Sequence, residues 1–380
     1  MNNQKHLFQL PDDIHYLNCA YMSPLLKSVE DVGIEGLIRK RNPTTIRPKD
    51  FFEQAEELKE NIGKLISSKA TNIALVPSVS YGMASAINNL PLNNGNKAIV
   101  LEYEFPSGFY TLQKWCEKNA KNLQIIKAPE SKEKRGKNWN ESLLEAINAD
   151  TAVVVLSSVH WTDGTKFDLE AIGKKCRENN TFFIVDGTQS VGATSIDVVT
   201  CNIDALVCAS YKWLFGPYSM GFIYFSERLF GGTPLEESWV NRSNAHNFAK
   251  LTDYTDEYTL GAGRYNVGET GNFILLPMFN ESIKQLLKWD VKHIEKYAEN
   301  LTQPLIEFLK NSPYHIEEDT YRSKHLFGIS LPENIDLENL LKELEANRIY
   351  VSVRGSSIRI STSVFNTTQD IDTLINTLKF

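Results

Sequence analysis

The sequence predicts an α/β protein in which a mostly parallel, doubly wound sheet of seven strands is followed by a smaller α+β domain. Between residues 73 and 225, short apolar runs alternate with stretches of helical periodicity, which is typical of strands connected by crossover helices. After residue 275 a long helical stretch precedes a mixture of short strands and helices. We therefore expect a large domain at 16–275 and a small domain at 276–380, with residues 1–15 packing on the small one.

The expected strands of the large sheet are short apolar runs that end at polar or turn-forming residues. They are 73–76, 98–102, 123–128, 152–156, 182–185, 205–209 and 221–225. Helices are expected at 51–67, from about 80, through Trp115, at 141–147 and at 168–178, where Asp168 is the expected N-cap. Residues 16–24 are expected to be extended. The polar, aromatic-rich stretch 231–258 is expected to be a mobile flap or a dimer-contact loop.

The small domain is expected to begin with a mainly helical stretch. Residues 274–309 have helical periodicity, including a stretch from about 280 to 311. The strands and helices expected after it are strands at 327–331, 349–353 and 358–360 and helices at 337–346 and 368–378.

Composition excludes several classes of function. The chain has 380 residues, of which 42% are hydrophobic and 23% charged, and its net charge of −7 argues against a nucleic-acid or anionic-membrane partner. No apolar run approaches the length of a membrane span and the first residues are polar, so a cytoplasmic location is expected. The five cysteines form no CxxC pair, so neither a disulfide framework nor a zinc site is indicated. No G-x-G-x-x-G or Walker motif is present, which counts against a dinucleotide or nucleoside-triphosphate site.

Two charged residues follow adjacent apolar runs. Asp186 ends the run at 182–185, and Lys212 comes three residues after the run at 205–209. Ligands bind at the C-terminal ends of parallel strands, so both side chains should face one crevice. A partly desolvated lysine near an acid is what imine chemistry requires: the lysine forms a Schiff base with pyridoxal phosphate, and the aspartate pairs with the pyridinium nitrogen. The competing interpretation, an ordinary strand-end acid and a surface lysine, accounts less well for the ordered set of residues around them.

The segments VDGTQS and SYKWLFGP carry a family resemblance. Together they resemble the class V branch of fold-type I pyridoxal-phosphate enzymes, which contains aminotransferases, cysteine desulfurases, selenocysteine lyases, kynureninases and isopenicillin-N-epimerase-like proteins. The resemblance covers nearly the whole chain and implies an amino acid substrate and a homodimer with sites at the subunit boundary. In the segment RYNVGETGNF it implies a cross-subunit phosphate contact, for which Thr270 is preferred over Glu269 and Asn272.

Further residues are predicted to hold the cofactor. VPSVSYG is a strand end that runs into a helix start, so the cofactor phosphate is expected on Ser78, the Val79 amide and Ser80, although one serine could simply cap the helix. By resemblance, Tyr211 also contacts the phosphate and Gln189 contacts the cofactor's 3′ oxygen. Phe105 follows a strand and is expected to stack on the ring, with a core position as the alternative. Three residues at another strand end could line the pocket: Ser157, His160, proposed to contact substrate, and Trp161.

In the small domain, Arg359 is the candidate for the substrate carboxylate. It lies between Ile358 and Ile360 in an expected strand, where an inward guanidinium needs an acidic partner. The resemblance assigns the matching arginine to the α-carboxylate, and a structural ion pair is the alternative. For Arg354 we expect that structural ion pair.

The resemblance also has a departure. Desulfurases carry a cysteine on a loop between the two matching arginines, and here the stretch is only Gly355-Ser356-Ser357-Ile358, so desulfurase chemistry is not expected. Cys19 is expected to be a core or pocket-wall residue. Three hypotheses remain: transamination, β-elimination or another lyase reaction, and a catalytically silent binding protein. Transamination is preferred, because the missing loop cysteine removes desulfurase chemistry, and the presence of Lys212, Asp186 and Arg359 together argues against a silent protein.

Overall fold

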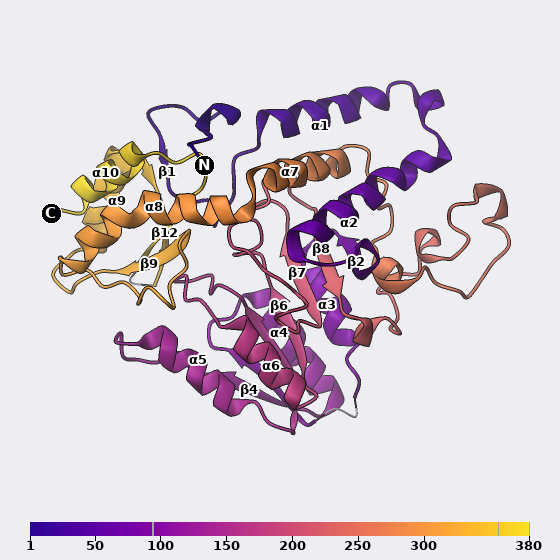
Figure 1. Cartoon of the computed structure of the whole chain (residues 1–380), viewed down its shortest axis with the longest axis horizontal. Helices are drawn as coiled ribbons and strands as arrows, with labels where there is room; N and C mark the ends of the chain where they lie inside the picture. Colours follow the sequence, from indigo (N-terminus) through magenta and orange to yellow (C-terminus); the bar gives the residue numbers. More distant parts are fainter. Residues whose placement is uncertain (93–94, 356, 380) are drawn as a thin grey trace.

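A seven-stranded sheet forms the centre of the computed structural model, which describes residues 1–92, 95–355 and 357–379 (Figure 1). Ser356, part of the short loop considered above, lies outside the described residues. The strand order is β2 (Ile73–Val76), β8 (Gly221–Phe225), β7 (Ala205–Ala209), β6 (Phe182–Asp186), β5 (Thr151–Ser157), β3 (Lys97–Leu101) and β4 (Asn122–Ile126). All neighbours pair in parallel except β8, which is antiparallel to β2 and β7. The predicted mostly parallel α/β sheet is confirmed.

Each strand divides its side chains between two hydrophobic cores. In β6, Phe183 and Val185 belong to one core, whereas Phe182 and Ile184 belong to the other. Successive side chains on a strand point to opposite faces, so a run that is apolar at every position is buried on both. Helices must therefore cover both faces of the sheet.

The helices form a layer on each face of the sheet. On one face lie α3 (Val79–Asn88) and α4 (Pro106–Asn119). On the other lie α2 (Glu53–Ile66), α5 (Arg135–Ala146), α6 (Leu169–Glu178) and α7 (Leu275–Trp289). In Figure 1, α1 (Lys27–Arg39), α7 and α2 lie one below another across the top of the molecule. Asp168 caps α6 as expected, accepting a hydrogen bond from the amide of Ala171 at 3.0 Å.

The C-terminal residues form a separate antiparallel sheet with its own apolar core. Its order is β11 (Ser352–Arg354), β12 (Ser357–Ser361) and β9 (Leu326–Ser330), and it is accompanied by α8 (Val291–Lys310), α9 (Leu337–Ala346) and α10 (Thr368–Thr377). The N-terminal β1 (His15–Tyr16) pairs in parallel with β10 (Ile349–Tyr350), so both chain ends lie on this side of the molecule (Figure 1).

Two sequence predictions were wrong in detail, and one helix was not predicted. The helical stretch at 280–311 is broken at Asp290, whose φ of 64° ends α7 and whose side chain caps α8. The single strand expected at 349–353 is two short strands, because β10 pairs with β1 whereas β11 pairs with β12. Helix α1 was not predicted, because it contains Gly33 and Gly36 and leaves several of its apolar side chains exposed.

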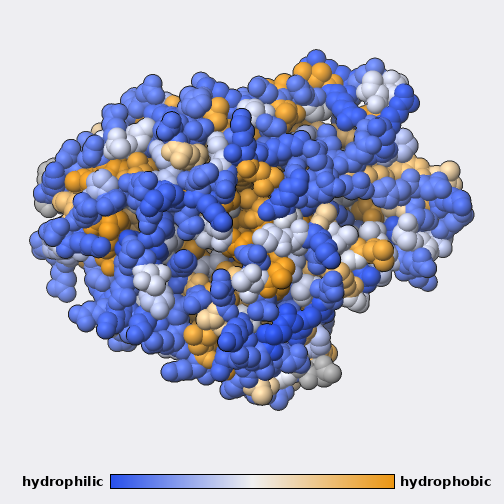
Figure 2. All heavy atoms as spheres, in the orientation of Figure 1, coloured by the Kyte–Doolittle hydropathy of each residue, from blue (hydrophilic) through white to orange (hydrophobic). Residues whose placement is uncertain are grey.

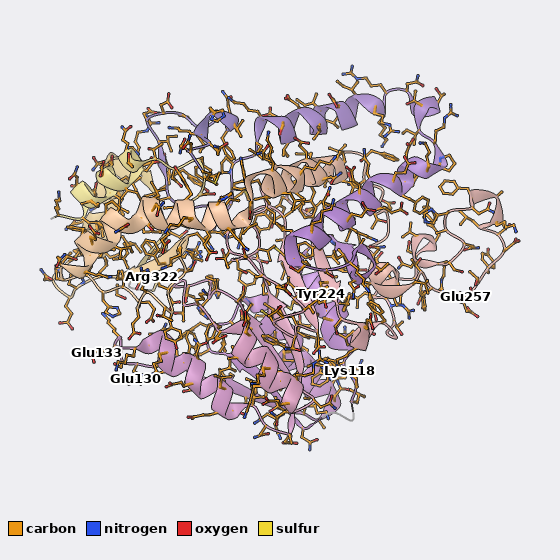
Figure 3. All side chains as sticks on the ribbon, viewed as in Figure 1. Lys118, Glu130, Glu133, Tyr224, Glu257 and Arg322 are labelled. Carbon is orange, nitrogen blue, oxygen red and sulfur yellow. The ribbon has the colours of Figure 1, made fainter. Side chains whose placement is uncertain are left out.

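The stretch 231–258 forms an irregular excursion at the edge of the molecule, where Glu257 is labelled in Figure 3. Its role as a flap or dimer contact stays a prediction. The face drawn in Figure 2 is mainly hydrophilic, with apolar residues gathered near its middle and along its upper rim. In the part of the chain that the structure describes, no helix is long and apolar enough to cross a membrane.

Candidate active site

A cavity of about 320 Å³ opens at the C-terminal ends of the central strands. Its walls contain most of the residues that the sequence predicted for the site, which come from five separate segments. They are Ser78, Val79, Ser80, Phe105, Ser157, Asp186, Gln189, Tyr211 and Lys212. Trp161 and Thr188 also line this cavity. A second cavity of about 410 Å³, next to Ser158 and Ser190, contains none of the predicted residues.

Lys212 and Asp186 are the two buried charges of this cavity. Their side chains belong to residues that are only 7% and 6% exposed, and neither forms a salt bridge with a described residue. Burial lowers the pKa of the Lys212 ammonium to about 8, although the Asp186 carboxylate partly opposes this. Burial likewise raises the pKa of Asp186, against the hydrogen bond that Thr188 donates at 2.9 Å. Buried charges are normally paired, so the cavity is built to receive a group that complements both.

The start of α3 forms one end of the cavity. Ser78 is the N-cap, and its hydroxyl accepts a hydrogen bond from the Tyr81 amide at 3.2 Å. The amides of Val79 and Ser80, in the first turn, have no intrahelical acceptor, and the helix dipole adds positive potential there. The Ser80 and Ser107 hydroxyls are 2.8 Å apart. This end of the cavity therefore suits an anion such as a phosphate.

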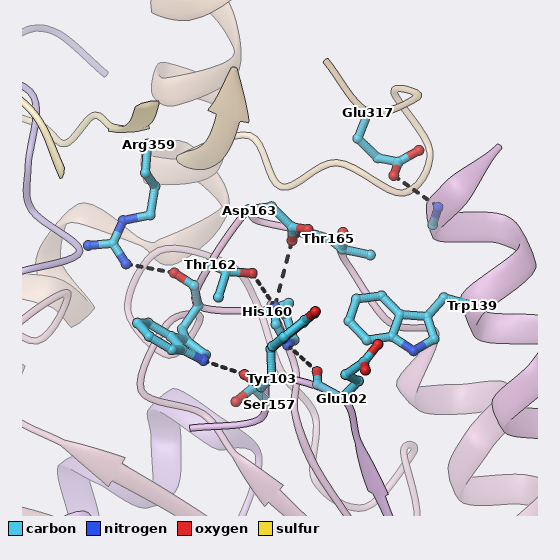
Figure 4. A network of polar contacts seen from close by, with 12 residues as sticks. Glu102, Tyr103, Trp139, Ser157, His160, Thr162, Asp163, Thr165, Glu317 and Arg359 are labelled. Carbon is cyan, nitrogen blue, oxygen red and sulfur yellow. Dashed lines mark hydrogen bonds and ion pairs between the residues drawn. The ribbon is translucent and has the colours of Figure 1, made fainter. Parts of the chain in front are cut away.

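Phe105 forms a wall of the same cavity. Its ring centroid is 5.8 Å from Lys212 Nζ, and the ring packs edge-on against Trp161 at 5.6 Å. The Trp161 indole N–H donates to the carbonyl of Tyr103 at 2.7 Å, which fixes the position of the indole (Figure 4). Phe105 is thus a cavity residue, and the alternative of a core position is wrong.

Glu104 is a buried acid that sequence reasoning did not select. Its carboxylate accepts hydrogen bonds from the amides of Phe105 and Ser157, both at 2.7 Å, and from the Ser157 hydroxyl. Burial raises its pKa to about 7. The sequence feature that could have identified Glu104 is an acidic residue that follows a strand, immediately precedes an aromatic residue and has no cationic residue beside it. Glu104 thereby positions two residues of the cavity wall.

Replacing Glu104 with alanine should lower the free energy of unfolding by about 2–4 kcal/mol, because three buried donors lose their acceptor. The folded protein holds this proton up to a pKa of about 7, above the ordinary 4.5, so the stabilisation is fully present below pH 4.5 and is lost as pH rises through 7. Urea denaturation should therefore show a larger loss at pH 5 than at pH 8. Glu117→Ala, which removes an exposed pair with Lys114, is the control and should cost less than about 1 kcal/mol at both pH values.

The structure does not bring His160 to the cavity. The imidazole is fully buried, with Nδ1 2.7 Å from the Thr162 hydroxyl and Nε2 3.2 Å from the carbonyl oxygen of Glu102 (Figure 4). Burial lowers its pKa, so the ring is neutral, with Nε2–H donating to Glu102 and Nδ1 accepting from Thr162. This histidine braces the loop that carries Trp161, and the prediction that it contacts substrate is not supported by its position.

Gln189 and Thr270 are two further residues that the sequence predicted for the site. Gln189 lines the cavity, but its amide N–H donates to the carbonyl of Ala20 at 3.2 Å and its oxygen accepts from the Trp213 indole at 3.0 Å. Thr270 is 8% exposed and lies outside the cavity wall of its own chain. Its predicted contact with a second subunit stays a prediction.

Arg359 is almost fully buried, at 1% exposure, and has no acidic partner among the described residues. One guanidinium nitrogen donates to the carbonyl of Trp161 at 2.6 Å, and Nε has no partner (Figure 4). The structural ion pair expected for Arg354 is also not found in the described part of the chain, so that prediction was wrong. A buried guanidinium that has no carboxylate partner within the protein can bind the carboxylate of a ligand.

The thiols offer no nucleophile. Cys19 is fully buried and outside the cavity wall, and burial raises its pKa to about 12. All five cysteines are free and buried. Within the residues described, no cluster of histidine, cysteine, aspartate and glutamate could hold a metal ion.

The aminotransferase class-V family profile matches residues 41–374. The chain belongs to the class V aminotransferase family. Among its relatives in this family, a kynureninase of Shouchella clausii is 23% identical over 94% of this chain and 83% of that protein. An uncharacterized aminotransferase of Bacillus subtilis is 23% identical over 76% of this chain and 72% of its own length. Among solved structures, a cysteine desulfurase from Thermococcus onnurineus has a TM-score of 0.84 at 18% identity, covering 100% of this chain and 98% of that one. The fold is therefore fold type I.

This class V enzyme uses pyridoxal phosphate, and the cavity fits that cofactor. The unpaired Asp186 suits a protonated ring nitrogen, the amine of Lys212 suits the carbonyl carbon, and the start of α3 suits the phosphate. These complementary groups are separate features of one cavity, so the fit does not depend on any one residue.

Proposed function

We propose that this class V enzyme transaminates an amino acid in the cavity between Asp186 and Lys212. The observation that carries the proposal is the combination of two unpaired buried charges in the cavity with an unpaired buried arginine beside it. The arginine supplies the substrate contact that a cofactor site alone would lack. Together they provide for a cofactor and for the carboxylate of an amino acid.

Each side chain has a role in this proposal. Bound pyridoxal phosphate supplies an electron sink that makes the hydrogen on the substrate's α-carbon acidic. Asp186 holds the proton on the cofactor's ring nitrogen, and its burial keeps water from competing for that contact. Phe105 stacks on the ring, while Ser78, Ser80, the Val79 amide and Tyr211 bind the phosphate.

Lys212 is the proposed base. Its pKa of about 8 leaves a useful fraction of neutral amine at physiological pH, so Nζ can take the proton from the α-carbon and return it at another atom. Arg359 orients the substrate by binding its α-carboxylate through two parallel hydrogen bonds. The wall formed by Phe105 and Trp161 limits access of water.

Elimination or another lyase reaction is the second candidate, because a relative of similar identity is named a kynureninase. It shares the same base and the same carboxylate contact. Cysteine desulfurase chemistry is not favoured, since all five thiols are buried and the stretch between Arg354 and Arg359 contains no cysteine. A silent binding protein would have no need to keep Lys212, Asp186 and Arg359 together.

Screening amino acids with and without a 2-oxo acid should decide between the two reactions. The purified protein is expected to be yellow. A transaminase should convert one equivalent of amino acid and then stall until a 2-oxo acid is added, because the amino group must be passed on. Absorbance of the cofactor and chromatography of the products measure this. Steady release of product from one amino acid without an acceptor would contradict transamination and support the lyase.

We also propose a homodimer in which Thr270 of each chain reaches the partner's phosphate. Apolar side chains exposed on α1 support a partner surface, since Ile34, Leu37 and Ile38 are 47%, 58% and 46% exposed. Sedimentation equilibrium should give twice the chain mass, and a monomer at micromolar concentration would contradict the dimer.

A further inference from the structure

Two arginines of the small sheet lie on one face of adjacent strands. In the register of β11 and β12, Ser352 pairs with Arg359 and Arg354 pairs with Ser357. Because side chains two residues apart on a strand share a face, Arg354 lies on the same face as Ser352 and Arg359. Diagonal neighbours in such a pair are close enough for long side chains to meet. The fold therefore places two guanidinium groups side by side.

Both guanidinium groups are held against Trp161 in the cavity wall. Arg359 donates to the Trp161 carbonyl at 2.6 Å, and the central guanidinium carbon of Arg354 is 5.2 Å from the indole centroid. Trp161 in turn packs on Phe105, whose ring centroid is 5.8 Å from Lys212 Nζ. Like charge from Arg359 and then from Arg354 also lowers the pKa of Lys212, after the larger effect of burial. The two arginines thus lie against Trp161, which lines the active-site cavity.

Neither arginine is neutralised by the described residues. No carboxylate lies within salt-bridge distance of either, and the Nε of each is buried without a partner. Arg354 donates only to the carbonyl of the preceding residue, Val353, at 2.7 Å. Two neighbouring cations that are partly removed from water repel each other and need anionic partners.

One α-carboxylate can neutralise only one of them. A purely structural role for Arg354, stacking on Trp161, would leave its buried Nε unpaired. A ligand with two anionic groups satisfies both arginines at once. Deepening the proposed function, on which it rests, we propose that the substrate is an amino acid with a second anionic group on its side chain, and that Arg354 binds this group while Arg359 binds the α-carboxylate.

Binding of unreactive dianions to the cofactor-loaded protein tests this directly. Succinate and glutarate should bind at least about 10-fold more tightly than succinamate and glutaramate, which have the same shape but one charge fewer. Including 3-phosphonopropionate distinguishes a side-chain carboxylate from a phosphate-like group. Isothermal titration calorimetry measures all five ligands without turnover.

Variants then assign the preference to a residue. Arg354→Gln should reduce the preference for dianion over monoanion to less than about 2-fold while leaving monoanion binding unchanged. Arg359→Gln should weaken both kinds of ligand. Arg348→Gln, which removes a guanidinium paired with Asp13 at the surface, is the matched control and should change neither.

Three outcomes would overturn the inference: dianions that bind no more tightly than their monoamides in the unaltered protein, a preference that survives Arg354→Gln, or neutral amino acids that react as well as aspartate and glutamate. The proposed function fails in a different way. If no amino acid changes the cofactor spectrum although succinate binds with the expected preference, then amino acid chemistry is wrong and the double-cation site stands. If neutral amino acids react as well as aspartate and glutamate, the proposed function stands and this inference fails.

Discussion

Replacing Lys212 with alanine is expected to lower kcat by roughly 10³-fold or more, because the variant loses both the covalent attachment of the cofactor and the base at the α-carbon. Lys212 is 7% exposed, and no other lysine is found among the described residues that line the cavity. Single-turnover absorbance measurements with an amino acid test this. Lys118→Ala, at an exposed position on α4 (Figure 3), should leave the rate unchanged.

The residue that attaches the cofactor can be located, and the pKa of its amine can be measured. Borohydride reduction followed by peptide mapping should place the pyridoxyl group on Lys212, and a label elsewhere would remove this residue from its role.

Attack on the cofactor requires the neutral amine, so the rate of cofactor uptake by the stripped protein should rise with pH and level off near pH 8. An ordinary lysine would still show a rising rate above pH 9. Uptake that keeps rising to pH 10 would mean that burial does not depress this pKa.

Asp186→Asn is expected to leave the cofactor bound but to lower kcat roughly 10²–10³-fold, with a smaller effect on cofactor affinity. The neutral amide cannot hold the ring-nitrogen proton, and this contact matters most when negative charge develops at the α-carbon. Steady-state kinetics and a cofactor titration measure the two effects separately.

Asp204→Asn is the matched control for Asp186→Asn. Asp204 is a buried aspartate that pairs with Arg228 at 2.8 Å and precedes β7, at the opposite end of the sheet from the cavity. Its loss should lower stability and leave kcat of the folded enzyme nearly unchanged. Near-normal turnover of Asp186→Asn, or an equal loss of kcat in both variants, would contradict the role of Asp186.

The sequence by itself determined the central sheet and the main charges of the site. Runs such as 182–185 and 205–209 are apolar at every position, which is typical of a strand buried on both faces. Once the sheet is parallel, Asp186 and Lys212 must meet at its C-terminal edge, because that edge is common to all parallel strands. The cavity residues around them followed from the same local rule, applied to the ends of β2, β3 and β5.

Tertiary structure alone decided the features that depend on which segments become neighbours. Periodicity shows which face of a strand a residue occupies but not which strand lies beside it, so the break between β10 and β11 was not predictable from the sequence. For the same reason Arg354 was expected to have a structural partner, although the register of β11 and β12 sets it beside Arg359. His160 was misjudged because its hydrogen bond to the carbonyl of Glu102 holds the ring away from the cavity. Glu104 was not selected because the amide of Ser157, with which it hydrogen-bonds, belongs to another strand. Apolar pattern and strand ends are local properties of a chain, whereas the pairing of charges is a property of its packing.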